Sequence, residues 1–346
     1  MSDRHGGPLL QLTLCRTREF LREPEAIFWV FAFPVVLALG LGLAFKNRGP
    51  QVVRIAVESG PGGAALQSAL DSAKGIEAEL LDKAEAERRL KTGRIALVVE
   101  PGNPAVFRYD STRSESYLSR LVVDNALQRS AGRQDVWEVR DVKVTEVGSR
   151  YIDFLIPGLI GMNIMGTGLW GVGFGIVRVR NRKLLKRLIA SPMKRSQYLL
   201  SNVLARLVFL VLEVGAVLLF GHFVFGVPIR GSILSIGAIV LIGAMTFAGL
   251  GILVASRVRT IEGVSGLMNL IMVPMWIFSG IFFAHSNFPD AIQPFIVALP
   301  LTAFNDALRG VMIDGSSLAA MAGLLGIVAA WGIGSFGVAV KIFRWE

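Results

Sequence analysis

The chain of 346 residues lacks the motifs on which most metalloproteins and hydrolases depend. It has one cysteine, Cys15, and three scattered histidines, His5, His222 and His285. Paired CxxC, H-E-x-x-H and G-x-S-x-G motifs are absent, which argues against a structural zinc site, a zinc protease and a serine hydrolase. The G-x-x-x-x-G-K-[ST] phosphate loop is also absent, so the chain does not hydrolyse ATP by that device. We expect no catalytic residue, no metal ligand and no cofactor in this chain.

The composition is that of an integral membrane protein. Hydrophobic residues make up 53% of the chain, charged residues make up only 18%, and glycine occurs 38 times. The formal charge of +10 raises the question of nucleic-acid binding. However, the basic residues cluster at the ends of apolar runs, where they set the orientation of membrane spans. We therefore exclude nucleic acid as a partner.

Six apolar runs are each long enough to cross a hydrocarbon core of about 30 Å. They cover residues 27–46, 151–177, 197–226, 232–256, 261–285 and 317–342. Basic residues next to a span stay in the cytoplasm. We therefore expect a multi-pass protein of the cell membrane (inner or plasma membrane), with cytoplasmic N- and C-termini and with residues 47–150 external.

Two shorter segments belong to the membrane part without spanning it. Residues 1–26 have the pattern of a helix lying in the cytoplasmic interface. Residues 286–312 hold two apolar pieces broken at Pro294 and Pro300, and such lengths predict re-entrant helices on the outer side. Asp306 and Arg309 lie three residues apart on the second piece, where they either pair locally or meet substrate head groups.

Residues 47–150 differ in kind, because they carry 16 basic and 15 acidic residues. Their patterning predicts a small external α/β domain. The expected strands are 52–57, 76–81, 94–99, 105–109 and 142–147, and the expected helices are 64–73, 83–90 and 114–130.

The most basic stretch, residues 178–196, lies between the second and third spans and contains no acid. On a helix, four apolar residues fall on one face and four basic residues fall on the opposite face. The apolar set is Leu184, Leu185, Leu188 and Ile189, and the basic set is Arg182, Lys183, Lys186 and Arg187. Such a helix either docks into an apolar groove with an acidic rim or binds anionic lipid head groups.

Three ionisable residues stand out in the third span, Arg206, Glu213 and, near the outer end, His222, which we interpret as an interfacial histidine. Arg206 and Glu213 are seven residues apart, which puts them on one helix face about 10 Å apart along the axis. At that axial distance we expect no direct contact between them. Glu213 either lines a transport path, pairs across a dimer or forms a salt bridge to another helix. In the second span, Gly171 and Gly175 form a G-x-x-x-G pair that permits close helix approach.

Three local motifs resemble those of a known family. They are REPEAIFWVFAFPVVLALGLGLAF (22–45), LIASPMKR (188–195), and PMWIFSGIFFAHSNFP with LPLTAFNDALRG (274–310). Together with the order of elements, they resemble the permease subunit of ABC-2 type transporters. The segment VRNRK (179–183) departs from the family pattern because it lacks an acid, and Ala284 and His285 stand where proline is common.

The resemblance implies a fold and a function. The fold is a polytopic α-helical membrane protein of six spans with a small α/β external domain. Residues 178–196 become a cytoplasmic coupling helix, ended by Ser191 and Pro192, that docks a separate ATPase subunit. That partner binds ATP and Mg, and a second permease copy, identical or not, completes the pathway.

The expected function is export of an amphipathic or lipid-like substrate. One alternative is an ATP-driven mechanical relay that acts on an envelope partner through the external domain, without transport. Another is a channel or secondary transporter, although Glu213 is nearly the only deep acid available for ion coupling.

Overall fold

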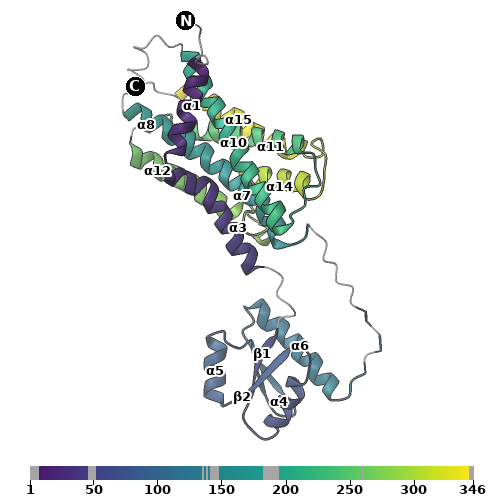
Figure 1. The fold of residues 1–346 in the computed structure, drawn as a ribbon. Coiled ribbons are helices and arrows are strands. Elements are labelled where there is room, and N and C mark those ends of the chain that lie inside the picture. Colours follow the sequence, from purple (N-terminus) through teal and green to yellow (C-terminus); the bar gives the residue numbers. More distant parts are fainter. Residues whose placement is uncertain are drawn as a thin grey trace. The chain divides into compact units, whose positions relative to one another are not determined.

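The computed structural model describes residues 8–45, 52–134, 136–137, 139–140, 148–181, 195–258 and 260–342. The chain forms two compact units (Figure 1). The helical unit comprises Met1–Lys46 and Val144–Glu346, and the α/β unit comprises Asn47–Lys143.

The helical unit contains six helices that are long and apolar enough to cross a membrane, counted over the residues that the structure describes. This confirms the number of spans expected from the sequence. Its elements are α1 (Pro8–Leu21), α2 (Pro24–Ile27), η1 (Phe28–Ala32), α3 (Phe33–Ala44), α7 (Tyr151–Gly166), η2 (Thr167–Phe174), α8 (Gly175–Asn181), α10 (Arg195–Phe225), α11 (Ile233–Ala255), α12 (Ile261–Phe278), η3 (His285–Asn287), α13 (Gln293–Val297), α14 (Pro300–Met312) and α15 (Ala322–Ile342). The candidate spans are Pro24–Ala44, Tyr151–Arg178, Ala205–Phe225, Ile233–Ala255, Ile261–Phe278 and Ala322–Ile342.

The first span contains a π-helical segment, η1, just before a proline. Pro34 has no N–H to donate to the carbonyl oxygen of Val30, four residues earlier. The side chain of Asn163 in α7 replaces that donor, because its Nδ2 lies 2.9 Å from the Val30 oxygen. A side chain from the second span therefore satisfies a backbone group of the first.

The helix formed by α7, η2 and α8 is the most buried of the six candidate spans and lies against α3, α10, α11 and α14 (Figure 1). Its π-helical part, η2, packs on α11 through glycine. A Cβ at Gly168 would lie 2.7 Å from Phe247 Cβ, and one at Gly173 would lie 2.6 Å from the Gly251 oxygen. The expected Gly171–Gly175 pair does not serve this purpose among the described residues, where a Cβ at either position meets nothing within 4 Å.

The fifth candidate span ends earlier than expected. The sequence predicted residues 261–285, but α12 ends at Phe278 because Gly280 adopts a positive φ of 68°. Two short helices follow, α13 of 5 residues and α14 of 13 residues, and proline lies in the first turn of each. Among the helical elements, α14 packs closely on α15, α7 and α11.

The α/β unit is a four-stranded sheet with helices around it (Figure 1). Its elements are β1 (Val53–Glu58), α4 (Gly63–Asp71), β2 (Ile76–Leu81), α5 (Lys83–Lys91), β3 (Leu97–Glu100), β4 (Val106–Arg108) and α6 (Ser114–Ser130). The strand order is β2-β1-β3-β4. In register, β1 pairs parallel with β2 (Val53↔Ile76) and with β3 (Ile55↔Leu97), and β4 is antiparallel to β3.

The core of the α/β unit follows from strand alternation. Ile55, Val57, Leu97 and Val99 are buried on one face of the sheet together with Leu70 of α4. This bears out a small sheet with helices in the insert. The expected strand at 142–147 lies outside the described residues.

Candidate functional site

The residues expected to dock an ATPase lie outside the described residues. This set is Arg182, Lys183, Leu184, Leu185, Lys186, Arg187, Leu188, Ile189, Ser191 and Pro192. The structure does describe the helix that leads into this segment. Arg180 Nη1 donates to the carbonyl oxygens of Ala255, at 3.1 Å, and of Val258, at 3.0 Å. Because carbonyls at a helix C-terminus lack partners inside the helix, Arg180 caps α11 and fastens α8 to it.

Arg206 and Glu213 contact each other directly, which corrects the expectation that they are too far apart. Arg206 Nη2 lies 3.0 Å from Glu213 Oε1, and Nη1 lies 3.5 Å from Oε2. Two helical turns separate their backbones, but both side chains are long. The Glu213 side chain also leans toward the N-terminus of its helix, and therefore toward Arg206.

Thr167, the first residue of η2, completes this group. Its hydroxyl accepts a hydrogen bond from Arg206 Nη2 and lies 3.3 Å from Glu213 Oε1. The same hydroxyl lies 2.9 Å from the Asn163 carbonyl oxygen of its own helix. We call Thr167, Arg206 and Glu213 the span cluster. It links the second candidate span to the third.

The two faces of α10 differ sharply at this level. The Glu213 side chain is fully buried and that of Arg206 is 24% exposed. On the opposite face, four apolar side chains are 37% to 72% exposed. They are Leu207, Val208, Val211 and Leu212. The carboxylate of Glu213 therefore points into the helical unit, toward the second span.

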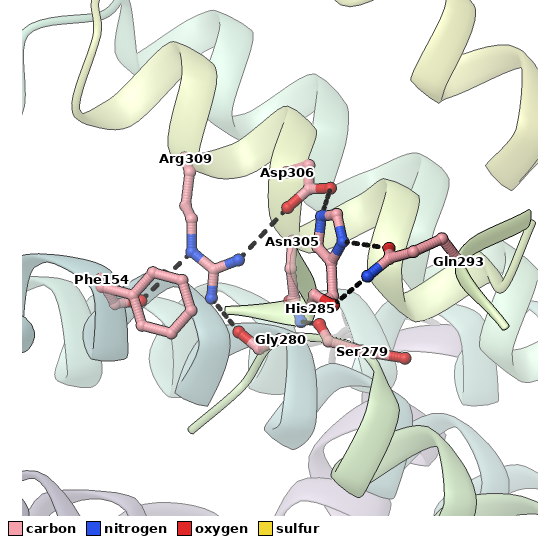
Figure 2. A network of polar contacts seen from close by, with 8 residues as sticks. All are labelled: Phe154, Ser279, Gly280, His285, Gln293, Asn305, Asp306 and Arg309. Atoms are coloured by element: carbon pink, nitrogen blue, oxygen red, sulfur yellow. Dashed lines mark hydrogen bonds and ion pairs between the residues drawn. The ribbon is translucent and has the colours of Figure 1, made fainter. Parts of the chain in front are cut away.

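A second polar group is built around Arg309 of α14 (Figure 2). Its Nε donates to the Phe154 carbonyl oxygen at 3.2 Å, and its Nη2 donates to the Gly280 carbonyl oxygen. Its guanidinium carbon lies 3.7 Å from the centre of the Phe154 ring, which adds a cation–π contact. Nη1 lies 3.3 Å from Asp306 Oδ1, so the predicted local pairing of Asp306 with Arg309 is confirmed.

The Arg309 side chain is only 13% exposed. Burial lowers the pKa of Arg309 to about 10, against the opposing effect of Asp306. The guanidinium therefore remains charged at neutral pH. It joins α14 both to α7 and to the turn that ends α12.

Asp306 also contacts His285, whose Nε2 lies 3.2 Å from Asp306 Oδ2 (Figure 2). His285 Nδ1 faces Gln293 Oε1 at 3.3 Å. The orientation of the Gln293 amide is fixed, because its Nε2 donates to the carbonyl oxygens of His285, at 2.6 Å, and Phe288, at 2.9 Å. We call His285, Gln293, Asp306 and Arg309 the turn network. The departure from the family pattern at His285 thus supplies one of its members.

Asn305, the neighbour of Asp306, faces the interior instead. Its Nδ2 donates to the Ser279 carbonyl oxygen at 2.9 Å (Figure 2). Its Oδ1 is buried against Gly161 of α7, and a Cβ at Gly161 would overlap that oxygen. Glycine at this position lets α7 and α14 approach closely.

Sequence reasoning missed three polar residues of the second candidate span that make side-chain contacts there, Asn163, Thr167 and Asp153. Asp153 is fully buried at the start of α7, where its carboxylate accepts from Gly148 N at 2.9 Å and from Arg150 Nη2 at 2.8 Å. The hydrogen bond to Asp153 raises the pKa of Arg150. The spacing of Arg150 and Asp153 at a helix start was a usable signal. An asparagine within an apolar run was another.

Among the described residues, no three His, Cys, Asp or Glu side chains are grouped so as to hold a metal ion. The acidic side chains of the span cluster and the turn network are engaged by Arg206, Arg309 and His285.

Known proteins similar to this chain point to one family. Residues 24–341 match the family model described as "ABC-2 family transporter protein". The chain is 20% identical over 337 residues to "Probable multidrug ABC transporter permease YbhS" of Escherichia coli (strain K12), with 88% of each chain covered.

Two further relatives match over a shorter stretch. "Linearmycin resistance permease protein LnrN" of Bacillus subtilis (strain 168) is 24% identical, over 51% of this chain and 46% of that protein. "ABC transporter G family member 20" of Dictyostelium discoideum is 27% identical, over 49% of this chain and 23% of that protein. The match therefore spans less than half the length of these two relatives.

Proposed function

This chain belongs to the ABC-2 family of transporter membrane proteins, and we propose on that premise that it is the permease of an ATP-driven exporter. The observation that carries the proposal is the family match over residues 24–341, which includes all but the last residue of the six candidate spans. Permease subunits of this family are not themselves catalytic. A separate ATPase subunit that binds ATP and Mg therefore supplies the free energy for transport.

The ATPase docks on the cytoplasmic segment 178–196. Its apolar residues Leu184, Leu185, Leu188 and Ile189 enter a groove of the ATPase, and the basic residues around them pair with an acidic rim. The anchoring of Arg180 to the end of α11 supports this role. A segment held firmly at its entry transmits force better than a loosely tethered loop.

Two permease copies form the pathway. In this arrangement the N- and C-termini are cytoplasmic, the α/β unit is external, residues 1–26 lie in the interface and residues 286–312 are re-entrant. The transported molecule is amphipathic or lipid-like. The relatives named as a probable multidrug permease and a linearmycin resistance permease support a drug-like molecule as the cargo. The comparisons lend no support to a mechanical relay.

The test is co-purification with a candidate ABC ATPase, followed by ATP-dependent uptake of a fluorescent amphipathic dye into inside-out vesicles. The chain should retain the ATPase. The quadruple variant Leu184→Ser, Leu185→Ser, Leu188→Ser and Ile189→Ser should lose both the ATPase and dye uptake, because it removes the apolar face.

A matched control places three serines on an exposed apolar face far from the segment in sequence. Leu118→Ser, Leu121→Ser and Val122→Ser change α6, where these side chains are 41% to 59% exposed. This control should bind the ATPase as the parent does. Equal ATPase binding by the quadruple variant would overturn the docking proposal, and intact docking without dye uptake would overturn the substrate class.

A further inference from the structure

The two helices that flank the docking segment are joined inside the membrane part. Residues 182–194 of that segment follow α8, which ends at Asn181, and precede α10, which begins at Arg195. Thr167 lies 14 residues before the end of α8, and Glu213 lies 18 residues after the start of α10. The span cluster therefore connects the helix that enters the docking segment with the helix that leaves it.

The chemistry of the span cluster opposes separation of these helices. The Glu213 carboxylate is fully buried, with Arg206 at 3.0 Å and the Thr167 hydroxyl at 3.3 Å. Within a hydrocarbon environment, a hydroxyl or a charge that loses its partner finds no water to replace it. Moving α10 away from η2 would break the hydrogen bonds of the Thr167 hydroxyl to Arg206 and to Glu213.

The start of η2 makes this connection specific. Thr167 lies where the helix changes from α to π geometry. Its hydroxyl lies within hydrogen-bond distance of the Asn163 carbonyl oxygen, 2.9 Å away, as well as of Glu213. Segments of π-helix are frequent at functional positions, because they change the direction in which the following side chains point. Here the change coincides with the contact to α10.

We propose that Thr167, Arg206 and Glu213 form a brace that makes the helices on either side of residues 182–194 move as one body. This proposal rests on the proposed function, in which the ATPase pushes on that segment. Arg206 and Glu213 are then positioning residues that carry force, and they do not touch the transported molecule. The burial of Glu213 on the face of α10 opposite Val208 and Val211 fits this role.

The brace is tested first on the permease alone in lipid nanodiscs, so the test does not depend on an ATPase. Spin labels are attached by Gly175→Cys and Val208→Cys in a Cys15→Ser background. In the described part of the chain a Cβ at Gly175 meets nothing within 4 Å and Val208 is 45% exposed, so both sites accept a label. The distance distribution between them, measured by pulsed electron resonance, should be narrow.

Thr167→Val removes the hydroxyl and keeps the shape of the side chain, so this distribution should broaden. Glu213→Gln should broaden the distribution as well. Thr167→Ser should leave the distribution narrow, because serine keeps the hydroxyl. Labels at Val208 and Leu219, both exposed on α10, provide a reference that none of these changes alters. A distribution in Thr167→Val as narrow as in the parent would overturn the brace.

A second readout distinguishes a brace from a substrate contact. In the permease–ATPase complex, Thr167→Val should lower the number of dye molecules moved per ATP hydrolysed by about tenfold, the factor that corresponds to about 1.4 kcal/mol. The KM for the dye and the retention of the ATPase should not change. A raised KM with unchanged molecules per ATP would assign these residues to the transport path and overturn the brace. Loss of the ATPase from the parent chain would instead count against the proposed function.

Discussion

The span cluster and the turn network each contain a partly buried arginine, but they stabilise it with different partners. In the span cluster, the hydrogen-bond partners of Arg206 among the described residues are side chains, those of Glu213 and Thr167. In the turn network, Arg309 contacts two backbone carbonyl oxygens, Phe154 and Gly280, as well as Asp306. The difference follows from where each arginine lies relative to helix ends.

Inside a helix every carbonyl already accepts a hydrogen bond, so a further donor must use the second lone pair of the oxygen, as Arg309 does at Phe154 in the first turn of α7. At the C-terminal end of a helix, the last carbonyls have no partner within the helix and can receive a guanidinium. Gly280 closes the end of α12 in a left-handed conformation, and its oxygen faces Arg309. Removing a partner should therefore be more damaging in the span cluster than in the turn network.

The largest effect is expected from Arg206→Leu. This change leaves the fully buried Glu213 carboxylate without its cation, and breaking such a pair costs about 3–5 kcal/mol. Unfolding of the purified protein by a denaturing detergent measures the loss. The double variant Arg206→Leu, Glu213→Leu should lose less stability than Arg206→Leu alone, because no charge is left unpaired. A double variant less stable than Arg206→Leu would contradict this account.

A smaller loss is expected from Arg309→Ala, about 2–3 kcal/mol in the same assay, because Asp306 is 29% exposed and retains water. Arg309→Lys serves as the control that keeps the charge and loses the stacked contact with Phe154. The free energy of unfolding of Arg309→Lys should lie between that of the parent and that of Arg309→Ala. If Arg309→Ala proved more damaging than Arg206→Leu, the contrast between the two groups would be reversed.

The smallest loss of unfolding free energy, about 1–2 kcal/mol, is expected from Asn163→Leu. This change removes the donor to the Val30 carbonyl oxygen in a buried position. Adding Pro34→Ala should recover stability, because alanine restores a backbone N–H four residues after Val30. An additive loss in the Asn163→Leu, Pro34→Ala double variant would show that the asparagine does not replace the missing backbone donor.

Much of the fold could be predicted from the sequence because its signals are local. Six runs of apolar residues are recognisable without knowing what they pack against, and β2 and α6 coincide with the predicted ranges 76–81 and 114–130. The pairing of Asp306 with Arg309 was predictable for the same reason. Residues three apart on a helix lie next to each other on one face, so their side chains can meet.

The candidate sites were less predictable because their contacts join distant parts of the chain. Asn163 contacts Val30, 133 residues away, and Arg309 contacts Phe154, 155 residues away. The contact between Arg206 and Glu213 was missed although it is local. Two helical turns separate the backbone positions of Arg206 and Glu213. Their side chains are long enough to span that distance and reach each other.

The sequence by itself determined the family, the six apolar spans and the presence of a separate α/β insert, because each depends on composition and periodicity along the chain. Only the tertiary structure decided that Gly168 and Gly173, and not Gly171 and Gly175, lie against α11. It also decided that Glu213 faces the second span through Thr167. The physical reason is that a span pattern records only that a helix is apolar, whereas which face meets which neighbour depends on how side chains from different helices fit together.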